Sequence, residues 1–283
     1  MTDALTILHA SDLQCGRPYV PRAADAFVWF AHELAPDVIV ISGDLTQRAK
    51  AHEFSAAREL MDRLPDVPKV VTPGNHDVPL FRVWERTLTP YRNWRAYISR
   101  ELDTVTRLEG ATFVALNSSS PYAAIVDGRI EPSQVELARR AFEETPAGDV
   151  RALVVHHHFV PTADGTGGIP LPGAAELLAA FEAMDVDLIL GGHVHRTHVH
   201  TSRELVPGGP DGIPLSACGT TTSRRGRATE FGINSLNVVR ASSREIEIVP
   251  HLLAPESERF TPVDAIVFPR GRAAEVVSEG SEP

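Results

Sequence analysis

Short apolar runs rich in β-branched residues alternate with amphipathic stretches through the first two thirds of the chain. The apolar runs end abruptly in polar residues or glycine, a pattern typical of strands that are buried on both faces. They lie at residues 5–8, 38–41, 69–72, 112–116, 152–155 and 187–190. The stretches between them place apolar side chains at helical spacing, as Phe27, Ala31 and Leu34 do. Helices are therefore expected at residues 21–34, 52–64, 132–144 and 173–184, and the alternation predicts a largely parallel core sheet.

The pattern changes from about Pro214 to Gly- and Thr-rich turns with shorter alternating runs. The runs at 233–239 and 245–251 predict antiparallel strands, which we expect to form a second sheet packed on the first. The fold class is then α/β, a four-layer α/β/β/α sandwich of two mixed sheets flanked by helices. One domain is expected over residues 1–270, followed by a disordered tail at 271–283 that is rich in Ala, Ser and Glu.

Composition argues against nucleic-acid-binding, disulfide-rich, secreted and membrane-spanning proteins. The 283 residues carry a formal net charge of −10, which argues against nucleic-acid binding because such partners require a basic surface. The two cysteines are too few for a disulfide framework, and the first residues lack the basic and apolar regions of a signal peptide. No window approaches the roughly 18 to 20 apolar residues of a membrane span. A cytoplasmic protein is therefore expected.

Polar side chains with metal-binding atoms follow five of the predicted strands. A single Asp or His in such a place is usually a turn former, but five strand ends can bring their donors to one crevice. The residues are Asp12, Gln14, Asp44, Asn75, His76, His156, His193 and His195. A mixed set of Asp, Asn and His without thiolates suits transition metals such as Mn, Fe or Zn, whereas an all-oxygen set would suggest Mg or Ca.

These segments resemble the calcineurin-like metallophosphoesterase superfamily, whose blocks run D-x-H, G-D, G-N-H-D, a strand-end H and G-H-x-H. Here the same order is found at residues 11–14, 43–44, 74–77, 156–158 and 192–195. The resemblance implies two divalent metal ions, Mn or Fe before Zn, with Asp44 bridging them and a bridging hydroxide as nucleophile. It implies one ion held by Asp12, Gln14, Asp44 and His195, and the other by Asp44, Asn75, His156 and His193. Gln14 departs from the family pattern, in which a histidine stands, and the alternative is that Gln14 only hydrogen-bonds a metal-bound water and leaves the ion three protein ligands.

The resemblance also implies roles beyond the metal ligands. His76 would act as a general acid, and Asp77 could orient its imidazole. Among the three consecutive histidines, His156 is the expected ligand because the family's ligand comes first after the strand, and His157 is a candidate substrate contact. Arg225, within the Arg-rich segment 224–227, is a second candidate because guanidinium groups match phosphate oxygens, although a solvated face is the alternative.

The chain looks most like small bacterial members related to cyclic-nucleotide phosphodiesterases. We expect a small phosphodiester substrate, because the sequence shows no dedicated basic pocket for a monoester dianion. One alternative is a nucleotide-lipid pyrophosphatase similar to the UDP-diacylglucosamine hydrolases, for which the aromatic segment 79–102 could bind acyl chains or form a helical cap. A second alternative is a metal-impaired binding or scaffolding module. The protein could act as a monomer or as a homodimer.

Overall fold

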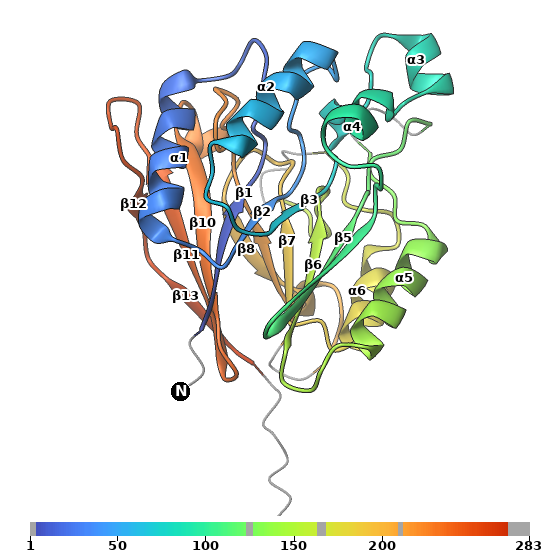
Figure 1. Ribbon diagram of the computed structural model, residues 1–283. Helices are drawn as coiled ribbons and strands as arrows, with labels where there is room; N and C mark the ends of the chain where they lie inside the picture. The colour runs from blue at the N-terminus through green and yellow to red at the C-terminus, as the bar shows by residue number, and fades with distance from the viewer. Residues whose placement is uncertain (1–3, 123–126, 163–167, 209–211, 271–283) are drawn as a thin grey trace, which may run out of the picture.

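The computed structural model describes residues 4–122, 127–162, 168–208 and 212–270 and shows two β-sheets packed face to face (Figure 1). The larger sheet has the strand order β12-β11-β10-β1-β2-β3, and β13 also pairs with β11. Its strands are β1 (Leu5–Ala10), β2 (Val38–Ile41), β3 (Lys69–Val71), β10 (Asn234–Ala241), β11 (Glu245–Leu253), β12 (Thr261–Pro262) and β13 (Ile266–Pro269). β1, β2 and β3 run parallel, whereas β10 pairs antiparallel with β1, as Leu5 opposite Ala241 shows.

The smaller sheet has the order β4-β5-β6-β7-β9-β8. β5, β6, β7 and β9 are parallel, and the edge strands β4 and β8 are antiparallel to their neighbours. The strands are β4 (Thr104–Leu108), β5 (Ala111–Leu116), β6 (Val150–Val155), β7 (Leu188–Gly191), β8 (His198–Thr201) and β9 (Pro214–Ala217).

The four-layer sandwich is confirmed, but the expected membership of its sheets is wrong. The two C-terminal strands β10 and β11 extend the first sheet past β1, and the second sheet is built from the middle of the chain. The reason is that β1 has two free edges, of which β2 takes one in parallel and β10 the other in antiparallel. The six predicted apolar runs are therefore divided equally between two sheets that are each mixed.

Helices cover the outer face of each sheet. α1 (Pro21–Leu34) and α2 (Ala51–Asp62) lie on the larger sheet, and α5 (Pro132–Glu143) and α6 (Ala174–Glu182) on the smaller one (Figure 1). Two short helices, α3 (Val83–Leu88) and α4 (Arg92–Tyr97), fall within the segment 79–102 where a helical cap was expected. None of the described helices is long and apolar enough to cross a membrane.

Alternation along each strand divides the apolar core into layers. In β2, Ile39 and Ile41 pack towards α1 and α2, whereas Val38 and Val40 pack between the two sheets with Phe113 of β5. All of these side chains are fully buried, which is why the strands read as continuous apolar runs. The expected tail at 271–283 lies outside the described residues.

Candidate functional site

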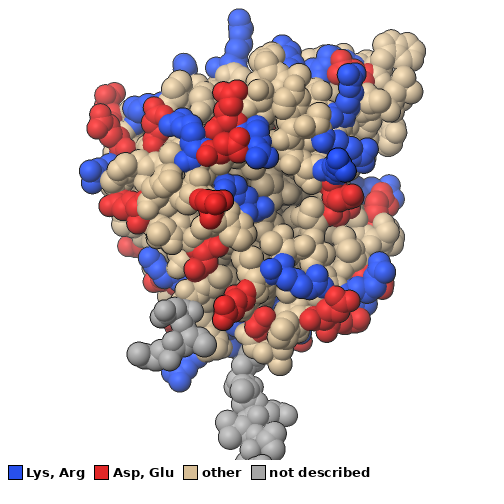
Figure 2. Space-filling view, in the orientation of Figure 1, with Lys and Arg blue, Asp and Glu red and all other residues tan. Residues whose placement is uncertain are grey.

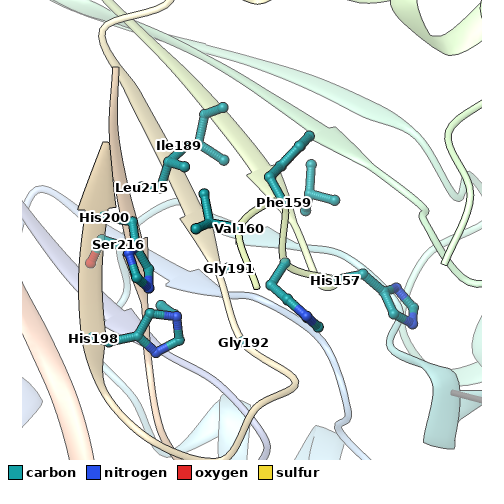
Figure 3. A pocket seen from close by; sticks show the side chains of 13 residues that line it. His157, Phe159, Val160, Ile189, Gly191, Gly192, His198, His200, Leu215 and Ser216 are labelled. Carbon is teal, nitrogen blue, oxygen red and sulfur yellow. The ribbon is translucent and has the colours of Figure 1, made fainter. Parts of the chain in front are cut away.

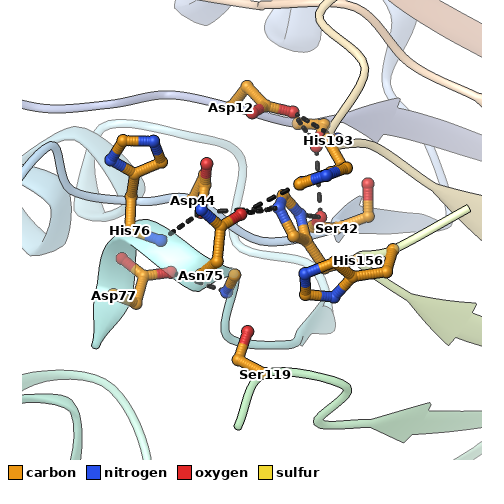
Figure 4. A network of polar contacts seen from close by, with 12 residues as sticks. Asp12, Ser42, Asp44, Asn75, His76, Asp77, Ser119, His156 and His193 are labelled. Carbon is orange, nitrogen blue, oxygen red and sulfur yellow. Dashed lines mark hydrogen bonds and ion pairs between the residues drawn. The ribbon is translucent and has the colours of Figure 1, made fainter. Parts of the chain in front are cut away.

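The loops that follow β1, β2, β3, β6 and β7 meet at one edge of the sandwich (Figure 4). Three of these strands belong to the larger sheet and two to the smaller one, so the site lies across both sheets and not in the crevice of a single sheet as expected. Contacts between residues as distant as Asp12 and His193 hold the two halves together there. The packing of the two sheets therefore creates the site.

Asp12, Asp44 and His195 form a compact group. We call these three residues and Gln14 the Asp12 group. One ligand atom from each of the first three lies within 4.8 Å of the others, and the exposed fractions of these residues are 0, 0 and 2%. His195 Nε2 lies 3.1 Å from Asp12 Oδ1, and Gln14 Nε2 lies 3.3 Å from both Asp44 Oδ2 and His195 Nε2. Buried carboxylates require a compensating positive charge, and this group can hold a metal ion.

Asn75, His156 and His193 form an adjacent group around one amide oxygen, which we call the Asn75 group. Asn75 Oδ1 lies 3.0 Å from His193 Nδ1 and 3.2 Å from His156 Nε2. His156 Nε2 also lies 3.4 Å from Asp44 Oδ1. Asp44 therefore stands between the two groups, with Oδ1 facing the Asn75 group and Oδ2 facing Gln14 of the Asp12 group. Figure 4 shows Asp44 beside Asn75 and His156.

Backbone carbonyls fix two of the imidazoles in the state that a metal requires. His156 Nδ1 donates to Ser42 O at 2.7 Å, and His195 Nδ1 donates to Arg225 O at 3.1 Å. Each ring then directs Nε2, the nitrogen that could bind a metal ion, towards the carboxylates, which is the usual arrangement of metal-binding histidines. Burial lowers the pKa of His156, but the charges of Asp44 and then Asp12 more than offset it and raise that pKa overall. The donor set thus fits divalent metal ions.

Left-handed backbone conformations concentrate at this site. Nine non-glycine residues of the described ranges have positive φ, and five of them are Asp12, Gln14, Asp44, His193 and His195. Such conformations cost an ordinary residue about 1 kcal/mol or more, and they persist at functional sites where the surrounding structure imposes them. The turns after β1, β2 and β7 therefore place side chains towards the centre at a cost in local stability.

The glycines of the sequence motifs let the backbone come close to the proposed ligands. A Cβ on Gly74 would lie 2.2 Å from Asp44 Oδ1, and a Cβ on Gly192 would lie 1.9 Å from Ser11 Oγ and 2.8 Å from Asp12 Oδ2. Ser11 Oγ in turn donates to Asp12 Oδ2 at 2.7 Å. A side chain at either glycine would push the ligating carboxylate out of place.

His76 lies beside the centre, with its backbone N–H donating to Asp44 Oδ1 at 2.8 Å. Its Nδ1 donates to the carbonyl oxygen of Gln47 at 2.9 Å, and its Nε2 accepts from Arg225 Nη1 at 2.8 Å. Burial lowers the pKa of His76; the charge of Asp44 opposes this effect and that of Arg225 adds to it. Arg225 therefore lies where a substrate contact was expected.

Asp77 does not make the contact that was expected of it. Its two carboxylate oxygens accept from the backbone N–H groups of Leu45, Thr46 and Gly74 and from the Thr46 hydroxyl, at 2.9 to 3.1 Å. Burial, and then the charge of Asp44, raise its pKa to about 7. The orienting contact to the His76 imidazole comes from Gln47 instead, a residue that no sequence motif marked. Asp77 ties the loop after β2 to the loop after β3.

His157 is also placed differently from expectation. His157 is 2% exposed, its Nδ1 lies 2.7 Å from Ser118 Oγ, and its ring centroid lies 4.6 Å from that of His193. In Figure 3 its ring points away from His198 and His200. A substrate contact would require an accessible ring, whereas these contacts pack His157 against a proposed ligand.

Ser223, like Gln47, is a residue of the site that no sequence motif marked. Its hydroxyl donates to Gln14 Oε1 at 3.1 Å.

The fold and the site are those of a phosphoesterase that uses divalent metals. A sequence model described as "Calcineurin-like phosphoesterase" matches residues 5–197, and the chain belongs to this family. The match covers every proposed ligand, and the family's chemistry is metal-dependent hydrolysis of phosphoesters by a dinuclear centre. No curated protein matches the sequence at a significant level.

Solved structures share the fold at low sequence identity. A purple acid phosphatase from yellow lupin (Lupinus luteus) aligns with a TM-score of 0.68 and 11% identity over 95% of this chain, which spans only 54% of the lupin protein. A dimetal phosphatase from Danio rerio aligns with a TM-score of 0.62 and 11% identity, covering 95% of this chain and 99% of that one. GAP50, described as the anchor in the inner membrane complex of Plasmodium, aligns with a TM-score of 0.61 and 14% identity over 95% and 90% of the two chains.

Proposed function

We propose that this protein is a dinuclear metal-dependent phosphodiesterase acting on a small substrate. The observation that carries the proposal is the convergence of two buried donor groups on Asp44, with one carboxylate oxygen facing each group. Asp44 would bridge two ions, with Asp12, Gln14 and His195 on one side and Asn75, His156 and His193 on the other. Bound divalent metals supply polarisation of the phosphoryl oxygens and lower the pKa of water towards neutrality.

The residues around the centre would bind and orient the diester. His76 reaches the centre from the loop after β3, and its imidazole is held by Gln47 on one side and Arg225 on the other. When a phosphate oxygen takes over the Arg225 guanidinium, His76 Nε2 would become free to take up a proton from solvent and pass it to the leaving alkoxide. A groove that begins at Arg225 leaves room for the second ester group, which a monoester lacks.

One observation favours the nucleotide-lipid alternative as a second candidate. Helix α3 and Phe81, two residues before it, expose large apolar side chains, with exposed fractions of 73% for Phe81, 66% for Val83, 81% for Trp84 and 72% for Leu88. In Figure 1 α3 projects from the corner of the molecule nearest the loops of the site. Such a patch could contact acyl chains. The scaffolding alternative is less favoured, because a binding module would not need both buried donor groups.

The proposal is tested by metal content and by a pair of model substrates. The Mn-loaded protein is expected to hold about two ions per chain and to hydrolyse bis-(p-nitrophenyl) phosphate faster than p-nitrophenyl phosphate. Asp44→Asn should lose both metal and activity, because the bridging charge is removed. His76→Ala should keep its metal and slow the diester reaction by roughly a hundredfold. Saturation at one ion, or faster hydrolysis of the monoester, would contradict the proposal.

A further inference from the structure

A groove adjoins the metal-ligand centre on the side of Arg225. Two backbone pairings create it, because Cys15 pairs with Thr46 and Tyr19 pairs with Ser223. The loop after β1 is thus held between the loop after β2 and the loop after β9. The resulting groove has a volume of about 790 Å³, within the range of ligand sites for molecules of nucleotide size.

The lining of the groove is strongly basic in an acidic protein. Arg17, Arg48, Lys50 and Arg225 contribute to it from all three loops, although the chain as a whole carries a net charge of −10. None of the four forms an ion pair with the part of the chain that the structure describes, whereas arginines such as Arg63 are paired with carboxylates. In Figure 2 basic side chains stand along the upper edge of the molecule, where these loops lie in Figure 1.

The acidic residue in the groove does not neutralise this charge directly. Glu53 is 4% exposed, and its Oε2 accepts from the backbone N–H groups of Arg48 at 2.8 Å and Lys50 at 3.2 Å. It thereby fixes the start of α2 and orders the loop that bears the two cations. The Arg48 side chain is held over the Phe81 ring, with Cζ 4.9 Å from the ring centroid. Of the cations on these loops, Arg48 is therefore held at the groove before an anion arrives, whereas Arg17 and Lys50 are exposed.

The groove is continuous with the proposed catalytic residues. Arg225 Nη1 contacts His76 Nε2 at 2.8 Å, and Gln47, whose carbonyl orients the same imidazole, lines the groove. A diester phosphate at the metal ligands would thus direct one of its ester groups past Arg225 towards Arg17, Arg48 and Lys50. The four basic residues lie in three separate segments of the chain, and only the paired loops bring them to one groove. The expectation that the protein has no basic pocket is therefore wrong.

We propose that this groove binds a second phosphate group of the substrate. The substrate class is then a small phosphodiester that carries an additional phosphate on the same nucleoside or similar core. This inference rests on the proposed function, since the scissile phosphate is assigned to the Asp12 and Asn75 groups. Two or three guanidinium and ammonium groups around a phosphate form charge-assisted hydrogen bonds, each about twice as strong as a neutral one.

The test compares thymidine 5′-(p-nitrophenyl phosphate) with the same compound bearing a 3′-phosphate. The Mn-loaded enzyme should show a KM about tenfold lower for the 3′-phosphorylated compound, with kcat little changed, because one added charge-assisted hydrogen bond strengthens binding by about that factor. Arg17→Ala and Arg48→Ala should each remove most of this gain and leave hydrolysis of the unphosphorylated compound within about twofold. Arg63→Ala, which removes an arginine paired with Asp25 outside the groove, is the matched control.

A binding measurement separates this inference from the proposed function. Calorimetry with adenosine 3′,5′-bisphosphate and adenosine 5′-monophosphate should show about tenfold tighter binding of the bisphosphate, and Arg48→Ala should abolish the difference. Equal affinities for the two nucleotides, or a difference that survives in both groove variants, would overturn the inference even if the enzyme is active. Absence of any phosphoester turnover combined with preferential bisphosphate binding would instead refute the proposed function alone.

Discussion

At the scale of single residues, Gln14 is the position where this chain departs from its family. Its Nε2 faces the centre while its Oε1 accepts from Ser223, and rotation of the amide would exchange the two, since the hydroxyl can also accept. An amide oxygen is a weaker donor to transition metals than an imidazole nitrogen. The Asp12 group should therefore hold its metal less tightly than the Asn75 group.

Substitution of Gln14 tests this expectation. Gln14→His should tighten the weaker metal site about tenfold or more, whereas Gln14→Ala should leave the affinity of the tighter site nearly unchanged. Calorimetric titration with Mn, followed alongside diester hydrolysis, measures both sites. If Gln14→His alters neither affinity nor metal preference, the side chain at this position does not face a metal ion.

At the scale of elements, α3 and α4 follow one another in the chain but differ in how they are attached. Trp94 of α4 is fully buried and its ring contacts Phe54 of α2 edge to face at 6.3 Å, whereas Trp84 of α3 is 81% exposed. Trp94→Ala should lower the free energy of unfolding by about 3 to 5 kcal/mol, and Trp84→Ala should change it by less than about 0.5 kcal/mol. Urea unfolding of the two variants compares them directly. Equal destabilisation would show that α3 is packed against another surface in solution.

At the scale of the whole molecule, the two cysteines report on how firmly the sandwich is closed. Cys15 is 2% exposed and Cys218 is fully buried, and burial raises the pKa of the Cys15 thiol to about 12 and that of Cys218 as well. Both thiols should be protonated at pH 8 and should react with a disulfide reagent only as fast as the protein opens. Reaction should become complete in denaturing urea and should be faster in Trp94→Ala. Rapid labelling of one thiol in the native protein would reveal local opening of its loop.

The sequence by itself determined the elements and the donor set. The apolar runs at 38–41 and 152–155 lie within β2 and β6, and helices were correctly placed at 21–34 and 132–144 to within a residue. These are local properties, because a continuous apolar run or a helical spacing of apolar residues can be recognised within one short segment. The motif residues are also local, since each follows directly on its strand, and for that reason the family could be identified before the geometry was known.

The tertiary structure alone decided which strands share a sheet and which side chains meet at the site's border. Partner choice for β1 depends on β10, more than 220 residues away, and nothing local distinguishes an added strand from a second sheet. Long-range packing also explains why Gln47, and not Asp77, orients the imidazole of His76. Asp77 is next to His76 in the sequence, but its carboxylate accepts hydrogen bonds from the loop after β2. The basic groove arises only when three loops are paired side by side. Electrostatic sites of this kind depend on long-range packing, which a single sequence does not display.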